Sequence, residues 1–71
     1  MAKVIGLQVT FGERVRAHRI ALGWSQAKLA AKLKRHQPDI CDLENGRHAP
    51  KLDTVQEIAR VLKVPARALL E

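Results

Sequence analysis

Apolar side chains recur three or four residues apart along most of the chain, which is the spacing of one face of an α-helix. The pattern predicts helices over residues 11–22, 26–33, 37–44 or 37–45, 52–62 and 66–70. The expected buried stripes contain Phe11, Val15, Leu22, Leu29, Ala30, Leu33, Ile40, Leu43, Leu52, Val55, Ile58, Ala59 and Leu62. No internal repeat or linker separates these segments. The pattern therefore predicts an all-α bundle of five short helices.

Capping residues indicate where the first three helices begin or end. Thr10, with Glu13 three residues later, forms a candidate capping box for the first helix. Gly23 is placed to end that helix in the left-handed conformation. Ser25 is the expected N-cap of the second helix. Pro38 lies in the first turn of the third helix, where its missing N–H does no harm.

Residues 1–10 are interpreted as an N-terminal arm that precedes a domain over residues 11–71. Apolar and β-branched side chains around Gly6 favour a short strand or an extended segment. A lone strand is not stable in water without a pairing partner. Two interpretations stay open: a disordered tail, or an arm whose apolar side chains pack on a partner subunit. Those side chains are Val4, Ile5, Leu7 and Val9.

The charge balance favours a polyanionic partner. The 71 residues include 13 Lys and Arg against 7 Asp and Glu, which gives a formal net charge of +6. A basic surface of this kind attracts nucleic acid, although solubility alone can also account for surface cations. A single domain of this length buries a thin core, so it depends on good helix packing or on a partner subunit.

Several classes of protein do not fit the sequence. Cys41 is the single cysteine and the three histidines are scattered, so neither a disulfide nor a zinc site is expected. No nucleophile–base pair, paired carboxylates or phosphate-binding glycine loop indicates an enzyme, and no cofactor is expected. Neither a signal peptide nor an apolar run of about 20 residues is visible. The sequence thus predicts a non-enzymatic cytoplasmic protein with no membrane partner.

Four motifs resemble the phage repressor and Cro type of helix-turn-helix domain, also called the XRE type. They are F-G-E-R-V-R at 11–16, G-W-S-Q-x-x-L-A-x-K-L at 23–33, I-x-x-L-E-N-G-R at 40–47 and I-A-x-x-L-x-V at 58–64. Single motifs are moderately specific, but their joint occurrence at these separations is strong. The resemblance implies a five-helix lambda-repressor-like fold in which residues 26–33 and 37–44 form the unit that reads double-stranded DNA.

The resemblance also implies which side chains face base edges. Gln37 and Pro38 open the third helix, and Asp42 lies one turn further along. Gln37 could read adenine through two hydrogen bonds, Pro38 could contact a thymine methyl group, and Asp42 could accept from the cytosine amino group. Cys41 lies beside this face and completes the set of base-contacting candidates, although a small thiol there is also consistent with a passive position.

A second set is implied to contact backbone phosphates. It contains Gln26, Lys28, Arg19, Asn45, Arg47 and Lys51. Gln26 begins the second helix, where an amide could join backbone N–H groups in binding one phosphate, or could serve only as a helix-start residue. Glu44 matches a position that pairs with a helix 1 arginine, here Arg19, behind the reading surface. Breaking such a pair would cost about 3 kcal/mol.

The third helix departs from the family pattern. It carries Asp39, Asp42 and Glu44 and no Lys or Arg. Asp39 is better explained as a carboxylate at the positive end of the helix dipole than as a recognition residue. Lys34 stands where a glycine is common, and a left-handed lysine would cost roughly 1 kcal/mol. Arg35 could pair with Asp39 four residues on. His36 replaces the usual Ser or Thr cap.

The predicted function is sequence-specific binding of double-stranded DNA by a transcriptional regulator. A homodimer is expected, because one recognition helix covers too few base pairs and a two-fold dimer reads two half-sites. A repressor or autoregulator fits, such as a Cro-like switch, a restriction-modification controller or an antitoxin with a toxin or other regulatory protein as partner. The acidic third helix keeps an alternative open: a protein-interaction module with weak or no DNA binding.

Overall fold

A computed structural model of the chain describes the backbone of residues 2–70 and the side chains of residues 9–70. Within this range the chain forms five helices and no strand, which confirms the all-α prediction. The helices are α1 (Ala2–Ala21), α2 (Gln26–Leu33), α3 (Gln37–Glu44), α4 (Leu52–Leu62) and α5 (Arg67–Leu70).

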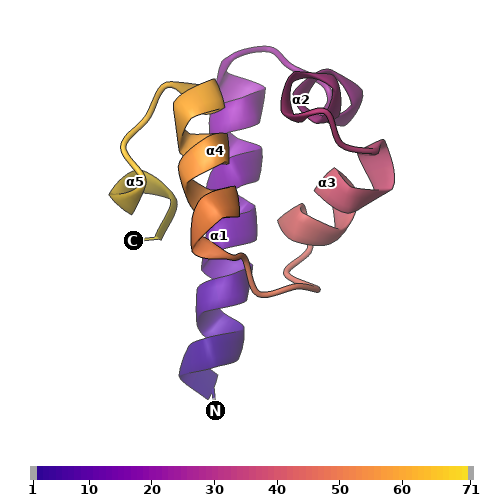
Figure 1. Cartoon of the computed structure of the whole chain (residues 1–71). Coiled ribbons are helices and arrows are strands. Elements are labelled where there is room, and N and C mark those ends of the chain that lie inside the picture. Colours follow the sequence, from indigo (N-terminus) through magenta and orange to yellow (C-terminus); the bar gives the residue numbers. More distant parts are fainter. Residues whose placement is uncertain (1, 71) are drawn as a thin grey trace.

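The helices pack around α1, which is the longest (Figure 1). α2 and α3 lie together on one side of α1, α5 lies on the opposite side, and α4 runs alongside α1 between them. The first turns of α1 project beyond the other helices (Figure 1). This arrangement leaves the outer surfaces of α2 and α3 uncovered by the rest of the chain.

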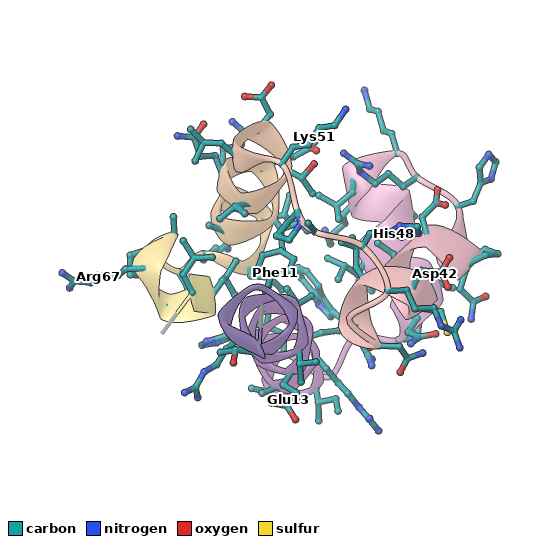
Figure 2. The ribbon with its side chains drawn as sticks, turned by 90° about the horizontal axis from the view of Figure 1, so that it is seen from below. Phe11, Glu13, Asp42, His48, Lys51 and Arg67 are labelled. Carbon is teal, nitrogen blue, oxygen red and sulfur yellow. The ribbon has the colours of Figure 1, made fainter. Side chains whose placement is uncertain are left out.

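The core is a single apolar cluster to which all five helices contribute. Its fully buried side chains are Phe11, Val15, Leu29, Ile40, Ile58 and Leu69. Phe11 lies in the middle of the molecule, between α1 and the other helices (Figure 2). Burying each large apolar side chain stabilises the fold by about 1.5–3 kcal/mol. The cluster holds α2 and α3 at a fixed angle to α1.

Two residues predicted to be buried are exposed. Leu22 is 43% exposed and Leu52 is 68% exposed. Both lie at helix ends: Leu22 follows the last residue of α1, and Leu52 is the first residue of α4. Helical spacing gives the direction of a side chain but not whether another element lies opposite it. At these two ends no other helix covers the stripe.

The structure also differs from the arm predicted before the first helix. α1 begins at Ala2, so Thr10 lies inside the helix and does not cap it. Residues 2–10 contain no proline, and extending an existing helix costs little per residue. Val9 is packed against the turn after α3: a Cβ atom on Gly46 would lie 3.2 Å from the Val9 Cα. Met1, Glu71 and the predicted packing side chains of residues 4, 5 and 7 lie outside the described residues.

The turn between α2 and α3 is tight and left-handed. Lys34 has φ 56° and ends α2, where its N–H donates to the carbonyls of Ala30 and Ala31. At the start of α2 the Ser25 Oγ accepts from the Lys28 N–H at 3.0 Å. His36 precedes α3 without a side-chain cap. α2 is therefore capped at both ends, whereas the start of α3 has no side-chain cap.

Candidate nucleic-acid interface

A buried ion pair fixes α3 to the end of α1. The Arg19 Nε donates to Glu44 Oε2 at 2.6 Å, and Nη2 donates to Oε1 at 3.0 Å. The Arg19 Nη1 donates to the Trp24 carbonyl at 2.7 Å. Arg19 follows Val15 by four residues, so it takes the next place on the buried stripe of α1. Its guanidinium thus connects α1, the turn before α2 and the last turn of α3.

This environment gives Arg19 a structural role. The hydrogen bond with Glu44 raises the pKa of the guanidinium, with a further contribution from the charge of Glu44, and these effects outweigh the lowering caused by burial. Arg19 is only 8% exposed, and each of its three nitrogens already donates to the protein. The phosphate contact expected of Arg19 stays a prediction, and these inward hydrogen bonds argue against it.

An amide chain continues from this ion pair to the start of α3. The Gln26 Nε2 donates to Glu44 Oε1 at 3.1 Å. The Gln37 Nε2 lies 3.5 Å from Gln26 Oε1, at the outer limit of a hydrogen bond. Gln26 is half-buried and Gln37 is exposed. The first residues of α2 and α3 are therefore aligned side by side, and the side-chain oxygen of Gln37 has no hydrogen-bond partner among the described residues.

The outward side of α3 carries two of the base-contacting candidates, Pro38 and Asp42. Because an α-helix turns by about 100° per residue, Pro38, Asp42 and Asn45 fall opposite the buried Ile40 and Leu43. Pro38 and Asn45 are exposed, and Asp42 is half-buried. These three residues, with Gln37 and Cys41 along one border, are called the reading face below.

Cys41 sits at the edge of the reading face and has a local partner. Its thiol is half-buried, and the Asn45 Nδ2 donates to the Cys41 Sγ at 3.3 Å. This contact joins successive turns of α3. Asn45 was expected to contact a phosphate, and it remains exposed at the end of the helix.

Asp42 does not stand alone as a negative charge. Arg47 Nη1 donates to Asp42 Oδ1 at 2.8 Å. The His48 Nε2 lies 3.6 Å from the other carboxylate oxygen, and this contact is an ion pair when the imidazole is protonated. Figure 2 shows Asp42 and His48 on one side of the molecule and Arg67 on the opposite side. The acid on the reading face is therefore balanced by the loop that follows α3.

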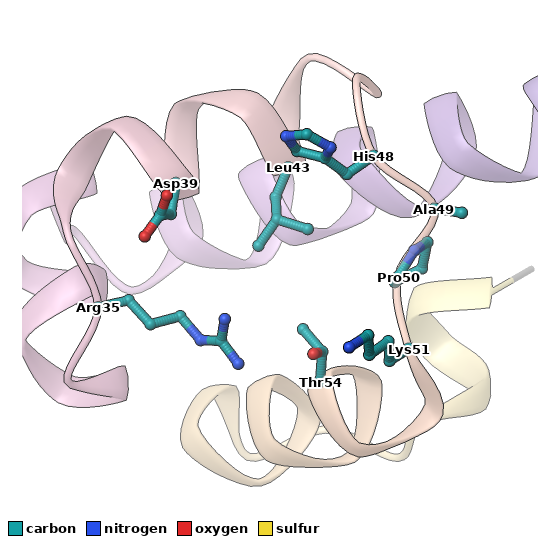
Figure 3. A pocket seen from close by; sticks show the side chains of 8 residues that line it. All are labelled: Arg35, Asp39, Leu43, His48, Ala49, Pro50, Lys51 and Thr54. Carbon is teal, nitrogen blue, oxygen red and sulfur yellow. The ribbon is translucent and has the colours of Figure 1, made fainter.

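Asp39 lies on a different side of α3, toward a groove. The groove has a volume of about 440 Å³ and separates α3 from α4 (Figure 3). Its lining is formed by Arg35, Asp39, Leu43, His48, Ala49, Pro50, Lys51 and Thr54. Arg35 pairs with Glu57 of α4 at 3.3 Å, so the predicted pairing with Asp39 is wrong. The reason is tertiary: α4 brings a second carboxylate to the guanidinium.

Cationic side chains border the α2–α3 unit. The Lys28 and Lys32 ammonium groups lie 5.7 Å and 4.9 Å from the Trp24 ring centre, within the range of cation–π attraction. Lys51 is exposed and precedes α4. Arg47 has a side chain that is 64% exposed. Exposed cations therefore lie on both sides of the reading face.

Sequence reasoning missed three participants in this site. His48 was read only as a loop residue, because its contact with Asp42 depends on how the chain leaves α3. Lys32 joins Lys28 over Trp24, which the i, i+4 spacing could have indicated. Gly12 lies where α1 meets α3: a Cβ there would clash with the Leu43 carbonyl oxygen. A glycine inside a predicted helix is the signal for such a close approach.

Neither a membrane span nor a metal site is found among the described residues. None of the helices has the length and apolar character that crossing a bilayer requires. In the same part of the chain, no three His, Cys, Asp or Glu side chains are grouped so that they could hold a metal ion.

Comparisons with known proteins agree with this geometry. A family model described as a helix-turn-helix domain matches residues 10–71. The crystal structure of a hypothetical transcription factor, NHTF from Neisseria, is 28% identical, covers 92% of this chain and 75% of that one, and superposes with a TM-score of 0.86. The restriction-modification controller protein C.AhdI from Aeromonas hydrophila is 31% identical over 87% of this chain and 94% of that one, with a TM-score of 0.81. The search of curated proteins gives no match.

Proposed function

The chain belongs to the XRE-type helix-turn-helix family of DNA-binding transcription regulators, and we propose that it acts as a homodimeric, sequence-specific autoregulator. In this proposal α3 enters the major groove and α2 crosses the sugar–phosphate backbone. Repression follows where the site overlaps a promoter. The protein works in the cytoplasm and uses no cofactor.

The observation that carries the proposal is the pairing of Asp42 with Arg47 at 2.8 Å. An unpaired carboxylate on the reading face would repel DNA, which was the main objection to a DNA-reading α3. With the guanidinium bound to it, the pair has no net charge and still offers directional donors and acceptors. The surrounding Lys28, Lys51 and Asn45 are then positioned for phosphates.

Each candidate has a stated role in this complex. Gln37 reads a base edge, and Pro38 contacts an apolar base surface. Gln26, half-buried beside Glu44, joins the first backbone N–H groups of α2 in binding one phosphate. Cys41 lies at the edge of the DNA major groove and makes no hydrogen bond to DNA in this proposal. Asp42 could accept from a cytosine amino group.

The presence of one α3 in each copy supports a dimer, because one recognition helix covers too few base pairs for a selective site. Two copies related by a two-fold axis would place their α3 helices in successive major grooves. The likeness to a restriction-modification controller supports a small regulator of its own operon as the setting.

Selection of bound sites from random DNA tests this function. We expect an inverted repeat with half-sites about one helical turn apart, and binding to it that weakens as salt rises. A mass measurement of the complex should give two chains per site. Absence of any selected site at low salt, together with a stable complex with another protein, would instead favour the protein-interaction module that the acids on α3 suggest.

A further inference from the structure

The turn after α3 folds Arg47 back onto the helix. The Gly46 N–H donates to the Leu43 carbonyl at 3.2 Å, and the Arg47 N–H donates to the Asp42 carbonyl at 3.0 Å. This pair of bonds, with Gly46 at φ 71°, is a Schellman motif. Arg47 is therefore fixed beside the last turn of α3, and both its backbone and its side chain bind Asp42.

The Arg47 side chain keeps one complete hydrogen-bonding edge free. Its Nη1 donates to Asp42 Oδ1, while the Nε and Nη2 edge, which carries two parallel N–H groups, has no partner within the described residues. The side chain is 64% exposed. Two parallel donors from an arginine match guanine O6 and N7, which is the commonest specific contact in the major groove.

We propose that Arg47, positioned by Asp42, reads a guanine in each half-site rather than gripping a phosphate. This inference rests on the proposed function and assigns Arg47 a role different from the one that the family resemblance implies. A phosphate contact is stronger when the side chain carries a full positive charge, and it does not require one fixed orientation of the side chain. The Asp42 carboxylate works against both requirements, because it cancels the charge of Arg47 and fixes the orientation of the guanidinium.

Asp42 is then a positioning residue for Arg47. Its second oxygen faces His48 Nε2 at 3.6 Å and remains able to accept from the amino group of a cytosine near that guanine. The two side chains would act together on a G·C-containing step, and Asp42 would exclude an uncompensated phosphate from the same position.

The experiment compares wild type, Arg47→Lys and Asp42→Asn on the selected site and on every single-base-pair variant of it, by fluorescence anisotropy at fixed salt. Lysine keeps the positive charge but lacks the two parallel N–H donors of the guanidinium. We expect Arg47→Lys to lose roughly 5- to 150-fold in affinity for each half-site of the selected site and to bind almost equally whatever pair replaces one particular G·C. Asp42→Asn should lose discrimination at the same pair while binding unrelated DNA more tightly, because a negative charge is removed.

Two outcomes overturn the inference. A loss that is uniform over all site variants would assign Arg47 to a phosphate, and so would full discrimination retained by Arg47→Lys. In either case the wild type still selects a site, so the proposed function stands. If the wild type selects no site, the proposed function itself fails. Arg67→Lys, on the opposite side of the molecule (Figure 2), is the matched control, and circular dichroism confirms that each variant is folded.

Discussion

Glu44 occupies the last turn of α3, where the helix dipole disfavours a carboxylate. Its position is favourable here because Arg19 binds both of its oxygens and Gln26 donates to one of them. The pair is 7–8% exposed, so neither charge can be resolvated by water without moving α3. The stability of the helix-turn-helix unit therefore depends on the hydrogen bonds that satisfy this buried charge, because the start of α3 has no side-chain cap.

We expect Glu44→Ala to reduce the free energy of unfolding by about 3 kcal/mol, because Arg19 would stay buried without its partner. Urea unfolding followed by circular dichroism measures the change. Glu13→Ala removes an exposed carboxylate from α1 and is the control; it should shift stability by about 0.5 kcal/mol or less. Equal effects of the two substitutions would contradict the role assigned to Glu44.

Lys34 holds a backbone conformation that lysine disfavours, with φ 56°. Replacing it by glycine should stabilise the protein by about 1 kcal/mol, since glycine adopts this region without a steric cost. Lys32→Gly, two residues earlier and inside α2, should destabilise by about the same amount. The two midpoints of thermal unfolding should thus move in opposite directions; movement in the same direction would show that the turn is not strained.

At the scale of elements, the approach of α1 to α3 decides where the reading face points. Gly12 lies at the crossing, and an added Cβ would clash with the Leu43 carbonyl oxygen and lie 2.6 Å from that of Glu44. Both neighbours are backbone atoms, which cannot rotate away. The position of α3 relative to α1 is therefore set by the absence of a side chain.

Gly12→Ala should destabilise the protein by about 2 kcal/mol, even though alanine is the better helix former, because overpacking outweighs the gain in helix propensity. It should also weaken DNA binding through displacement of α3. Calorimetry and an anisotropy titration measure the two effects. Arg16→Ala, at an exposed position of the same helix, should change neither. A stabilised Gly12→Ala protein would show that the helices have room to move apart.

The bounds of the helices were predictable where local chemistry marks both ends. α2 has Ser25 before it and a left-handed turn after it, and α4 has a continuous apolar stripe; both have the predicted bounds. The start of α1 was not predictable from Thr10, because a local capping signal competes with continuation of the helix, and the helix continues through Thr10 to Val9, which packs on Gly46. The pairing of Arg35 with Glu57 was equally hidden, because the two residues are distant in sequence.

For the site, the resemblance supplied residue positions but not their mutual contacts. The Arg19–Glu44 pair follows from family position, whereas the contacts of Asp42 with Arg47 and His48 depend on the turn after α3. A sequence shows that Gly46 can be left-handed, but it does not show which side chain the turn brings back. That is why Asp42 looked like an unbalanced charge until the structure placed Arg47 beside it.

At the scale of the whole molecule, a net charge of +6 and the exposed cations around α2 and α3 give a DNA affinity that depends on salt. We expect Lys51→Ala to weaken binding by a similar factor on every site variant and to reduce the slope of log affinity against log salt by about 1 per subunit. Titrations at four salt concentrations measure this slope. A base-dependent loss would move Lys51 out of the phosphate-contacting set.

The chain of contacts from Gln26 through Glu44 to Arg19 has a consequence for how this regulator can change over evolutionary time. It anchors α3 entirely from its inner side, so substitutions at Pro38, Asp42 or Asn45 leave that anchor untouched. The DNA sequence that the domain prefers can then change through single substitutions at outward residues of α3, while the contacts that anchor α3 stay the same. A duplicated copy of such a domain could acquire a new operator while keeping the same scaffold.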